Sequence, residues 1–180
     1  MNVRISYPAE FVAGVYWNNK VLFNTYQVRC KMVTATSDPI EQNIALERLK
    51  YMLFHQMQNS VFVADKEKSA IKKLETAGVP TIAVPLEPVD QIIGMMLYCK
   101  LNAIMEGRMV VTGLDIQSTL GDQVWYLHDE EDALGPFADD GWWTYPSVQH
   151  ETIERDPVAE NVVKVTTTGW HEYGLEWPEE

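Results

Sequence analysis

The side chains of this sequence with the most obvious chemistry gather in HDEEDALGPFADDGWW, residues 128–143, which holds six carboxylates and two adjacent tryptophans. Clustered carboxylates suit a hard divalent cation such as calcium. The twelve residues from Asp129 to Asp140 match the length of an EF-hand loop, but the fifth is Ala133 and the sixth, where the turn needs glycine, is Leu134. The stretch is therefore not an EF-hand, and a non-standard cation site, a docking surface and a solvated acidic loop remain as interpretations.

Three histidines of the C-terminal third offer a second kind of metal site. His128, His150 and His171 are each followed directly by a carboxylate. A three-histidine zinc site is chemically sensible, and ligating histidines often have carboxylate partners. In a strand, however, adjacent side chains point to opposite faces, so the neighbouring acid does not orient its own histidine. The alternative hypothesis is a metal-binding protein or metal-dependent hydrolase with a divalent metal as cofactor, set against the simpler reading of surface histidines.

No catalytic residue can be assigned from motifs. The sequence has no GxSxG serine, no phosphate or dinucleotide glycine pattern, no HExxH and no CxxC. Cys30 falls in an expected strand and Cys99 in an apolar helix, where a thiol behaves as a small core residue. We therefore predict no cofactor and favour a non-enzymatic protein.

The aromatic residues of the same stretch favour the docking interpretation. Tryptophan and tyrosine are enriched at the energetic centres of protein interfaces, because one rigid side chain removes a large area from water. The alternative is that they pack together as the loop's own small core. We predict a partner-binding surface with at least one exposed indole. Its expected contact residues are Trp142, Trp143, Tyr145 and Phe137, with steering charge from Asp129, Glu130, Glu131, Asp132, Asp139 and Asp140.

The charge of the chain is strongly uneven along its length. Residues 1–108 carry 12 basic and 10 acidic side chains, whereas residues 109–180 carry 2 basic and 16 acidic ones together with five of the six tryptophans. Such an asymmetry indicates a basic protein partner and disfavours direct binding to a nucleic acid backbone. A sharper hypothesis is an acidic decoy that occupies the basic, nucleic-acid-binding groove of its partner. Competition by DNA or RNA would distinguish this version.

Length and composition indicate one ordinary globular domain. The 180 residues are 46% apolar and 22% charged, and they contain no linker, low-complexity tract or repeat. We expect a single domain over 1–180, with a near-neutral core over 1–108 and an acidic, tryptophan-rich part over 109–180. Two cysteines without a framework spacing and no secretion signal predict a cytoplasmic protein. The longest apolar stretch is broken by Lys100 and is too short for a membrane span.

The elements that position these residues begin with strands and one helix. NVRIS, residues 2–6, alternates as a short strand stopped by Pro8. Two β-prone runs around Asn18-Asn19 predict a hairpin, with the second strand continuing through residue 36. Asp38 and Pro39 then predict a helix start, Glu41 is placed to complete a capping box, and the helix should extend to about residue 58.

The remaining pattern is a βαβ unit followed by a buried helix and a hairpin. Strands at 61–64 and 81–84 flank a helix at about 66–77 that Asp65 can cap, which predicts parallel pairing. The helix near 89–106 has almost no polar face, so it is either deeply buried or the interface of a homo-oligomer. Residues 108–119 and 123–130 predict an antiparallel hairpin, and 161–168 a last strand. The fold class is α+β: a mixed sheet with one parallel βαβ unit, two to three helices and a loop-rich, acidic C-terminal third.

Overall fold

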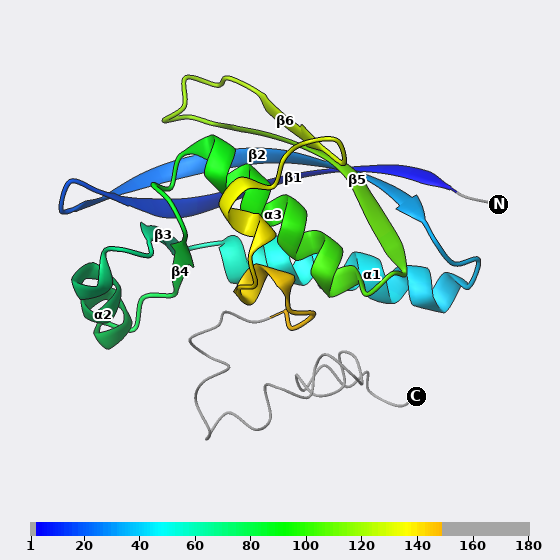
Figure 1. Ribbon diagram of the computed structural model, residues 1–180, viewed down its shortest axis with the longest axis horizontal. Helices are drawn as coiled ribbons and strands as arrows, with labels where there is room; N and C mark the ends of the chain where they lie inside the picture. The colour runs from blue at the N-terminus through cyan, green and yellow to red at the C-terminus, as the bar shows by residue number, and fades with distance from the viewer. Residues whose placement is uncertain (1–2, 149–180) are drawn as a thin grey trace, which may run out of the picture.

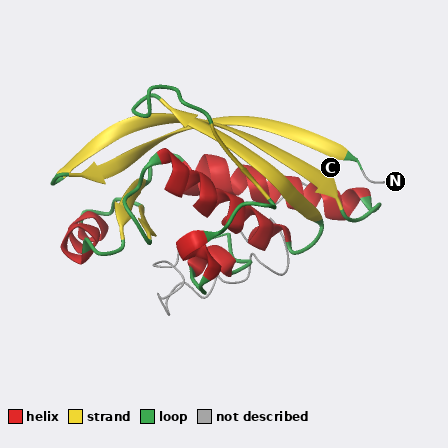
Figure 2. Ribbon diagram, turned by 45° about the horizontal axis from the view of Figure 1, so that its top comes forward, coloured by secondary structure: helices red, strands yellow, loops and turns green. Residues whose placement is uncertain are grey.

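The protein consists of a curved sheet that lies over a layer of helices (Figures 1 and 2). The structure is a computed structural model that describes residues 3–148. In chain order its elements are β1 (Arg4–Trp17), β2 (Lys20–Thr34), α1 (Pro39–Tyr51), η1 (Met52–Met57), β3 (Val61–Ala64), α2 (Lys68–Thr76), β4 (Thr81–Val84), α3 (Asp90–Met105), β5 (Met109–Ser118), β6 (Tyr126–Asp129), η2 (Gly135–Ala138) and η3 (Trp142–Thr144). The predicted α+β class is confirmed. The last predicted strand, 161–168, lies outside the described residues.

The β1–β2 hairpin is the longest feature of the sheet. Asn18 and Asn19 both adopt positive φ, 49° and 61°, as the two-residue turn requires, and this confirms the predicted hairpin. The predicted stop at Pro8 is wrong, because β1 continues through it and pairs with β2 from Arg4 to Trp17. A proline is tolerated where its missing N–H would face an unpaired edge. On its other side β1 pairs with β3 only at Gly14 and Val15, so no described strand occupies that edge at Pro8.

The described part of the sheet has the order β4-β3-β1-β2-β5-β6. β3 and β4 pair in parallel from Val61–Thr81 to Ala64–Val84, as predicted for the βαβ unit. Helix α2 starts later than expected and its cap position is Glu67, while Asp65 forms an ion pair with Lys68. β5 and β6 pair antiparallel, which confirms the second predicted hairpin.

Helix α1 starts where the sequence predicts, but the acid in its first turn has a different partner from the one expected. The Asp38 side chain accepts a hydrogen bond from the Ile40 backbone N–H at 2.9 Å, and Pro39 follows it. Glu41 does not complete a capping box: it pairs with Arg108 at 2.5 Å and so ties α1 to the start of β5. The predicted helix continues to Met57, although its last turn is a π-helix.

Helix α3 lies between two layers of the protein. Eleven of its sixteen residues are buried, against three of the thirteen in α1. The sheet covers one side of α3, and the segment containing η2 and η3 crosses its other side (Figure 1). This arrangement explains the missing polar face and confirms deep burial. Within residues 3–148, the helices are all too short or too polar to cross a bilayer.

Candidate functional site

The acidic part of the predicted docking surface lies on the outside of the protein. Its carboxylates, at positions 129–132 and at Asp139 and Asp140, belong to exposed residues. The turn after β6 is held by its own side chains: Asp132 accepts from the Asp129 N–H and Asp129 accepts from the Glu131 N–H, both at 2.9 Å. These acids therefore face solvent.

Trp142 does not lie where a docking anchor would. It is only 3% exposed, and its indole N–H donates to the Ala83 carbonyl at 2.9 Å. Beneath it, the fully buried Lys100 ammonium lies 5.4 Å from the Trp142 ring centroid and donates to the carbonyls of Trp142 and Tyr145, both at 2.9 Å. The side chain that breaks the apolar pattern of α3 thus fastens the following segment to that helix.

The other aromatic residues complete a small core within the segment. Trp143 is half-buried, donates to the carbonyls of Phe137 and Asp139, and meets the Phe137 ring edge-to-face at 5.1 Å. Phe137 is buried, and of the four predicted aromatic contact residues only Tyr145 is exposed, at 47%. The expectation of a substantially exposed indole is therefore wrong, because Trp142 is buried and Trp143 is half-buried. Backbone carbonyls accept hydrogen bonds from both indole N–H groups, so both rings can pack against the protein without losing a polar contact.

Of the three histidines in the metal hypothesis, only His128 can be placed. It is 5% exposed on the helix-facing side of β6, opposite Leu114, and its Nε2 has no hydrogen-bond partner among residues 3–148. Burial lowers the pKa of His128. The negative charges of Asp132, Asp115 and Asp129 act in the opposite direction and raise it, but the effect of burial is larger. His150 and His171 lie outside the described residues. The part of the chain that the structure describes contains no cluster of three potential metal ligands.

The position of His128 indicates that a larger side chain at Gly94 would lower the stability of the protein. A β-carbon added to Gly94 would lie 2.5 Å from His128 Nε2 and 2.6 Å from the Ile116 side chain. Although Gly94→Ala would gain up to about 1 kcal/mol of helix propensity, overpacking typically costs about 1–3 kcal/mol. We expect a net loss of stability in urea titration, and partial recovery in Gly94→Ala/His128→Ala. If Gly94→Ala were more stable than the parent, this close packing would be contradicted.

Both cysteines behave as core residues. Burial raises the pKa of Cys30 to about 12, with the Asp115 charge adding to the effect, and burial raises the pKa of Cys99 to about 11. At neutral pH both side chains are thiols, and a thiol is a poor nucleophile and metal ligand. This agrees with the structural role that the sequence indicated for them.

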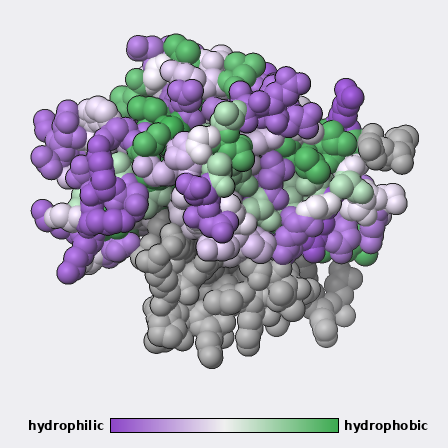
Figure 3. Space-filling view, viewed as in Figure 1, coloured by the Kyte–Doolittle hydropathy of each residue, from purple (hydrophilic) through white to green (hydrophobic). Residues whose placement is uncertain are grey.

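A hollow at one end of the sheet is lined by a buried carboxylate that no sequence motif indicated. Helix α3 begins at Asp90, and the β1–β2 hairpin extends beyond this point (Figure 1). The hollow has a volume of about 320 Å³. Its lining residues are Val15, Trp17, Leu22, Asn24, Pro88, Val89, Asp90, Leu120, Gly121 and Tyr126. Figure 3 shows hydrophobic surface in this region, between the hairpin and the β5–β6 connection. We call this region the open end.

Asp90 is the charged residue of that lining. It is 8% exposed, and the Ser118 hydroxyl lies 2.8 and 2.7 Å from its two carboxylate oxygens. The Gly121 N–H donates to the same Ser118 oxygen at 3.0 Å, and a β-carbon on Gly121 would collide with the Asp90 carboxylate. Burial raises the pKa of Asp90, while the hydrogen bonds from Ser118 oppose the rise. None of the ion pairs found within residues 3–148 involves Asp90.

The buried hydroxyl of Tyr26 is close enough to feel the charge of this carboxylate. Tyr26 is fully buried, and its hydroxyl makes no well-formed hydrogen bond to any of residues 3–148. Burial raises the pKa of Tyr26; the nearby Asn24 side chain opposes this, and the Asp90 charge adds to it. Asn24 itself accepts a hydrogen bond from the Leu120 N–H at 3.0 Å. Asn24 and Asp90 are therefore the polar side chains that line an otherwise apolar hollow, and Tyr26 is buried behind them.

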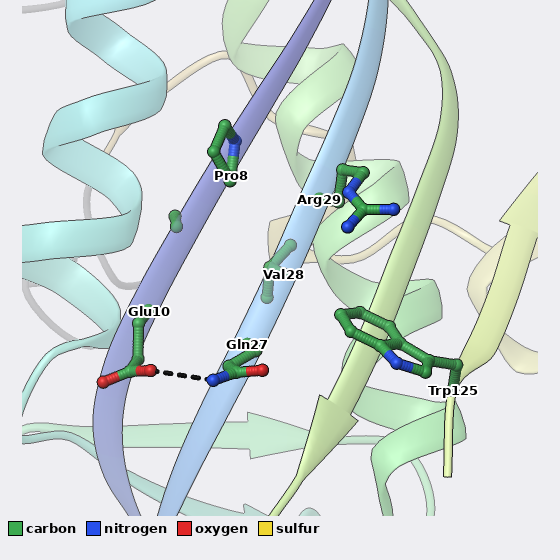
Figure 4. Close-up of a pocket in the computed structure, with 7 residues that line it drawn as sticks. Pro8, Glu10, Gln27, Val28, Arg29 and Trp125 are labelled. Atoms are coloured by element: carbon green, nitrogen blue, oxygen red, sulfur yellow. Dashed lines mark hydrogen bonds between the residues drawn. The ribbon is translucent and has the colours of Figure 1, made fainter. Parts of the chain in front are cut away.

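The outer face of the sheet carries another, shallower depression of about 360 Å³ (Figure 4). Its sides are the Trp125 indole, with the Arg29 guanidinium 5.6 Å from the ring centroid, and the hydrogen-bonded pair Glu10–Gln27. Pro8, Ala9 and Val28 form its floor. Its polar side chains contact one another and solvent, so it lacks the buried, unpaired carboxylate of the open end.

Comparisons with known proteins identify a fold without a function. No protein-family model and no curated protein matches the chain. Among solved structures, protein WS1659 from Wolinella succinogenes is similar at a TM-score of 0.52 with 10% identity, covering 73% of this chain and 99% of that one. The 6-pyruvoyltetrahydropterin synthase from Plasmodium vivax aligns at 0.46 with 8% identity, covering 71% and 97%. That from Plasmodium falciparum aligns at 0.45 with 11% identity, covering 71% and 96%. The first likeness shows a shared fold, and no activity is inferred from any of them.

Proposed function

We propose that this protein is a non-enzymatic binding module that docks onto a basic protein partner through the open end of its sheet. The observation that supports this most strongly is the gathering of exposed apolar side chains there. Of the residues that line the hollow, Leu120 is 52% exposed and Val89 47% exposed. The other apolar lining residues with at least a third of their surface in solvent are Trp17, Leu22 and Tyr126. Single exposed apolar residues are ordinary, but a contiguous group around a hollow is typical of an interaction surface.

Charge supports a basic partner. The chain carries a net charge of −12, and its run of exposed carboxylates at 129–132 begins with the last residue of β6, the strand whose first residue lines the hollow. Charges around an apolar contact mainly accelerate association and exclude wrong partners, while the buried apolar contact slows dissociation. In this proposal the acids keep the steering role expected from the sequence, and the open end replaces the tryptophans as the anchor.

The proposal is tested by affinity capture from the native host with the full chain as bait. We expect a basic protein to be retained, and its binding by Trp17→Ser/Leu120→Ser to be at least tenfold weaker through a faster off-rate. Raising the salt concentration should lower the on-rate, because the screening length is only about 8 Å at physiological ionic strength. Val110→Ser is the matched control, since Val110 is also exposed but lies at the far end of β5. Equal retention by the open-end variant and the parent would contradict docking at this surface.

The decoy hypothesis makes a narrower prediction about the same partner. A run of four exposed carboxylates at 129–132 can occupy a groove that otherwise binds phosphates. If the captured partner uses such a groove, double-stranded DNA or RNA should compete with the chain for it. Without competition, the partner is held at a surface that does not bind nucleic acid.

A further inference from the structure

We propose that the hollow at the open end receives an arginine side chain of the partner, with its guanidinium paired to Asp90. This inference rests on the proposed function and adds the group that the site recognises. The occupant is a cation because the charged residue lining the hollow is a carboxylate, and because the chain carries a net charge of −12.

The carboxylate is available for such a partner. A hydroxyl has one proton, so the Ser118 hydroxyl can donate to only one of the two Asp90 oxygens at a time, and the Ser118 backbone N–H contributes one more hydrogen bond. An ionised carboxylate has about four acceptor positions, so about two of them are left over. Burying a charge without an opposite charge is costly, and buried charges in proteins are normally paired. A guanidinium entering the hollow would supply both the missing charge and the missing donors.

The walls of the hollow suit the rest of an arginine side chain. Val15, Leu22 and Leu120 can contact the aliphatic stem, which long basic side chains readily bury against apolar surface. Trp17 and Tyr126 contribute aromatic rings, and guanidinium groups stack on such rings. Arginine fits better than lysine because its planar head is weakly hydrated and forms two parallel hydrogen bonds with a carboxylate.

The position of Asp90 at the start of α3 offers a simpler role, since an acid in the first turn favours a helix. That role does not require burial, and an exposed acid would fulfil it at less cost. The close approach of Gly121 also indicates a built site, because any larger residue would displace the carboxylate. The two roles make different predictions for Asp90→Asn, which keeps the shape and the capacity to accept from Ser118 but removes the charge.

The test uses the full chain labelled with ¹⁵N and titrated with N-acetyl-arginine methylamide, with the neutral isostere N-acetyl-citrulline methylamide as comparison. We expect the arginine compound to shift the amide signals of Asn24, Leu120 and Gly121 in a saturable manner, and the citrulline compound to bind at least tenfold more weakly. Asp90→Asn should weaken arginine binding at least tenfold. Asp122→Asn, a matched change of a neighbouring exposed acid, should alter it less than twofold.

Thermal unfolding provides the check on folding. Because burial disfavours the charged form of Asp90, Asp90→Asn should melt at or above the parent's temperature at pH 7. A substantially lower melting temperature would assign Asp90 to helix stability and overturn the inference. Equal binding of both compounds, or no shift with either, would also overturn it. The capture experiment with Trp17→Ser/Leu120→Ser is independent of these results, so docking at the open end can stand when the arginine inference fails.

Discussion

Replacing Trp142 with alanine is expected to lower the free energy of unfolding by roughly 3–5 kcal/mol, the usual cost of truncating a buried tryptophan. Three losses combine in this variant. The cavity left by the indole opens over α3, the Ala83 carbonyl loses its donor, and the Lys100 ammonium loses the ring beneath which it lies. Denaturation in urea, followed by circular dichroism, measures the change.

Neighbouring aromatic residues provide the controls for this prediction. Tyr145 is exposed, so Tyr145→Ala should change stability by no more than about 0.5 kcal/mol. Trp143 is half-buried and should give an intermediate loss. If Trp142→Ala were as mild as Tyr145→Ala, the indole would not be part of the core, and the docking role predicted from sequence would regain support.

Local sequence signals predicted most of the fold. The Asn18-Asn19 turn, the Asp38-Pro39 helix start and the short strands of the βαβ unit each depend on neighbouring residues, and the structure has all of them. Helix α3 was also predictable, because a helix without a polar face has to be covered on all sides. Pro8 was misread because tolerance of a proline depends on whether the strand edge is free, and this depends on how far β3 pairs along β1.

The environment of each candidate site residue was harder to predict, because it depends on residues that are distant along the chain. The sequence marks Trp142 as an unusual residue, but its burial depends on Ala83 and Lys100, which are 59 and 42 residues away along the chain. Composition alone does not distinguish a tryptophan that binds a partner from one that closes its own segment. The exposed acids were easier to foresee, since dense carboxylates in a short loop cannot all be buried.

Asp90 shows the same limit at the open end. Its sequence signal was weak: one acid at the start of an apolar helix, where an acid is ordinary. What makes it a candidate is its contact with Ser118, 28 residues later in the chain, and its place in a hollow lined by β1, β2 and the β5–β6 connection. Both depend on the sheet order, which brings these elements to one end of the molecule.

A truncation in helix α3 is expected to cause the second large loss of stability. Its result also distinguishes burial of α3 within one chain from burial against a second copy of the chain. Leu101 is fully buried within the main hydrophobic core. Leu101→Ala should therefore lower the free energy of unfolding by roughly 2–5 kcal/mol, with the spread set by how far the cavity collapses. Light scattering should give the same mass for the variant as for the parent.

The alternative, that α3 is an oligomer interface, predicts the opposite pair of results: a loss below about 1 kcal/mol together with a smaller assembly. Val110→Ala is the matched truncation on the outer face of β5, where the side chain is exposed, and should change stability by no more than about 0.5 kcal/mol. The two layers that enclose α3 both belong to this chain, the sheet on one side and the segment held by Lys100 and Trp142 on the other. A second copy would have to displace that segment to reach the helix. For this reason any self-association of the described part should leave α3 covered, and Leu101→Ala should weaken the fold while the number of subunits stays the same.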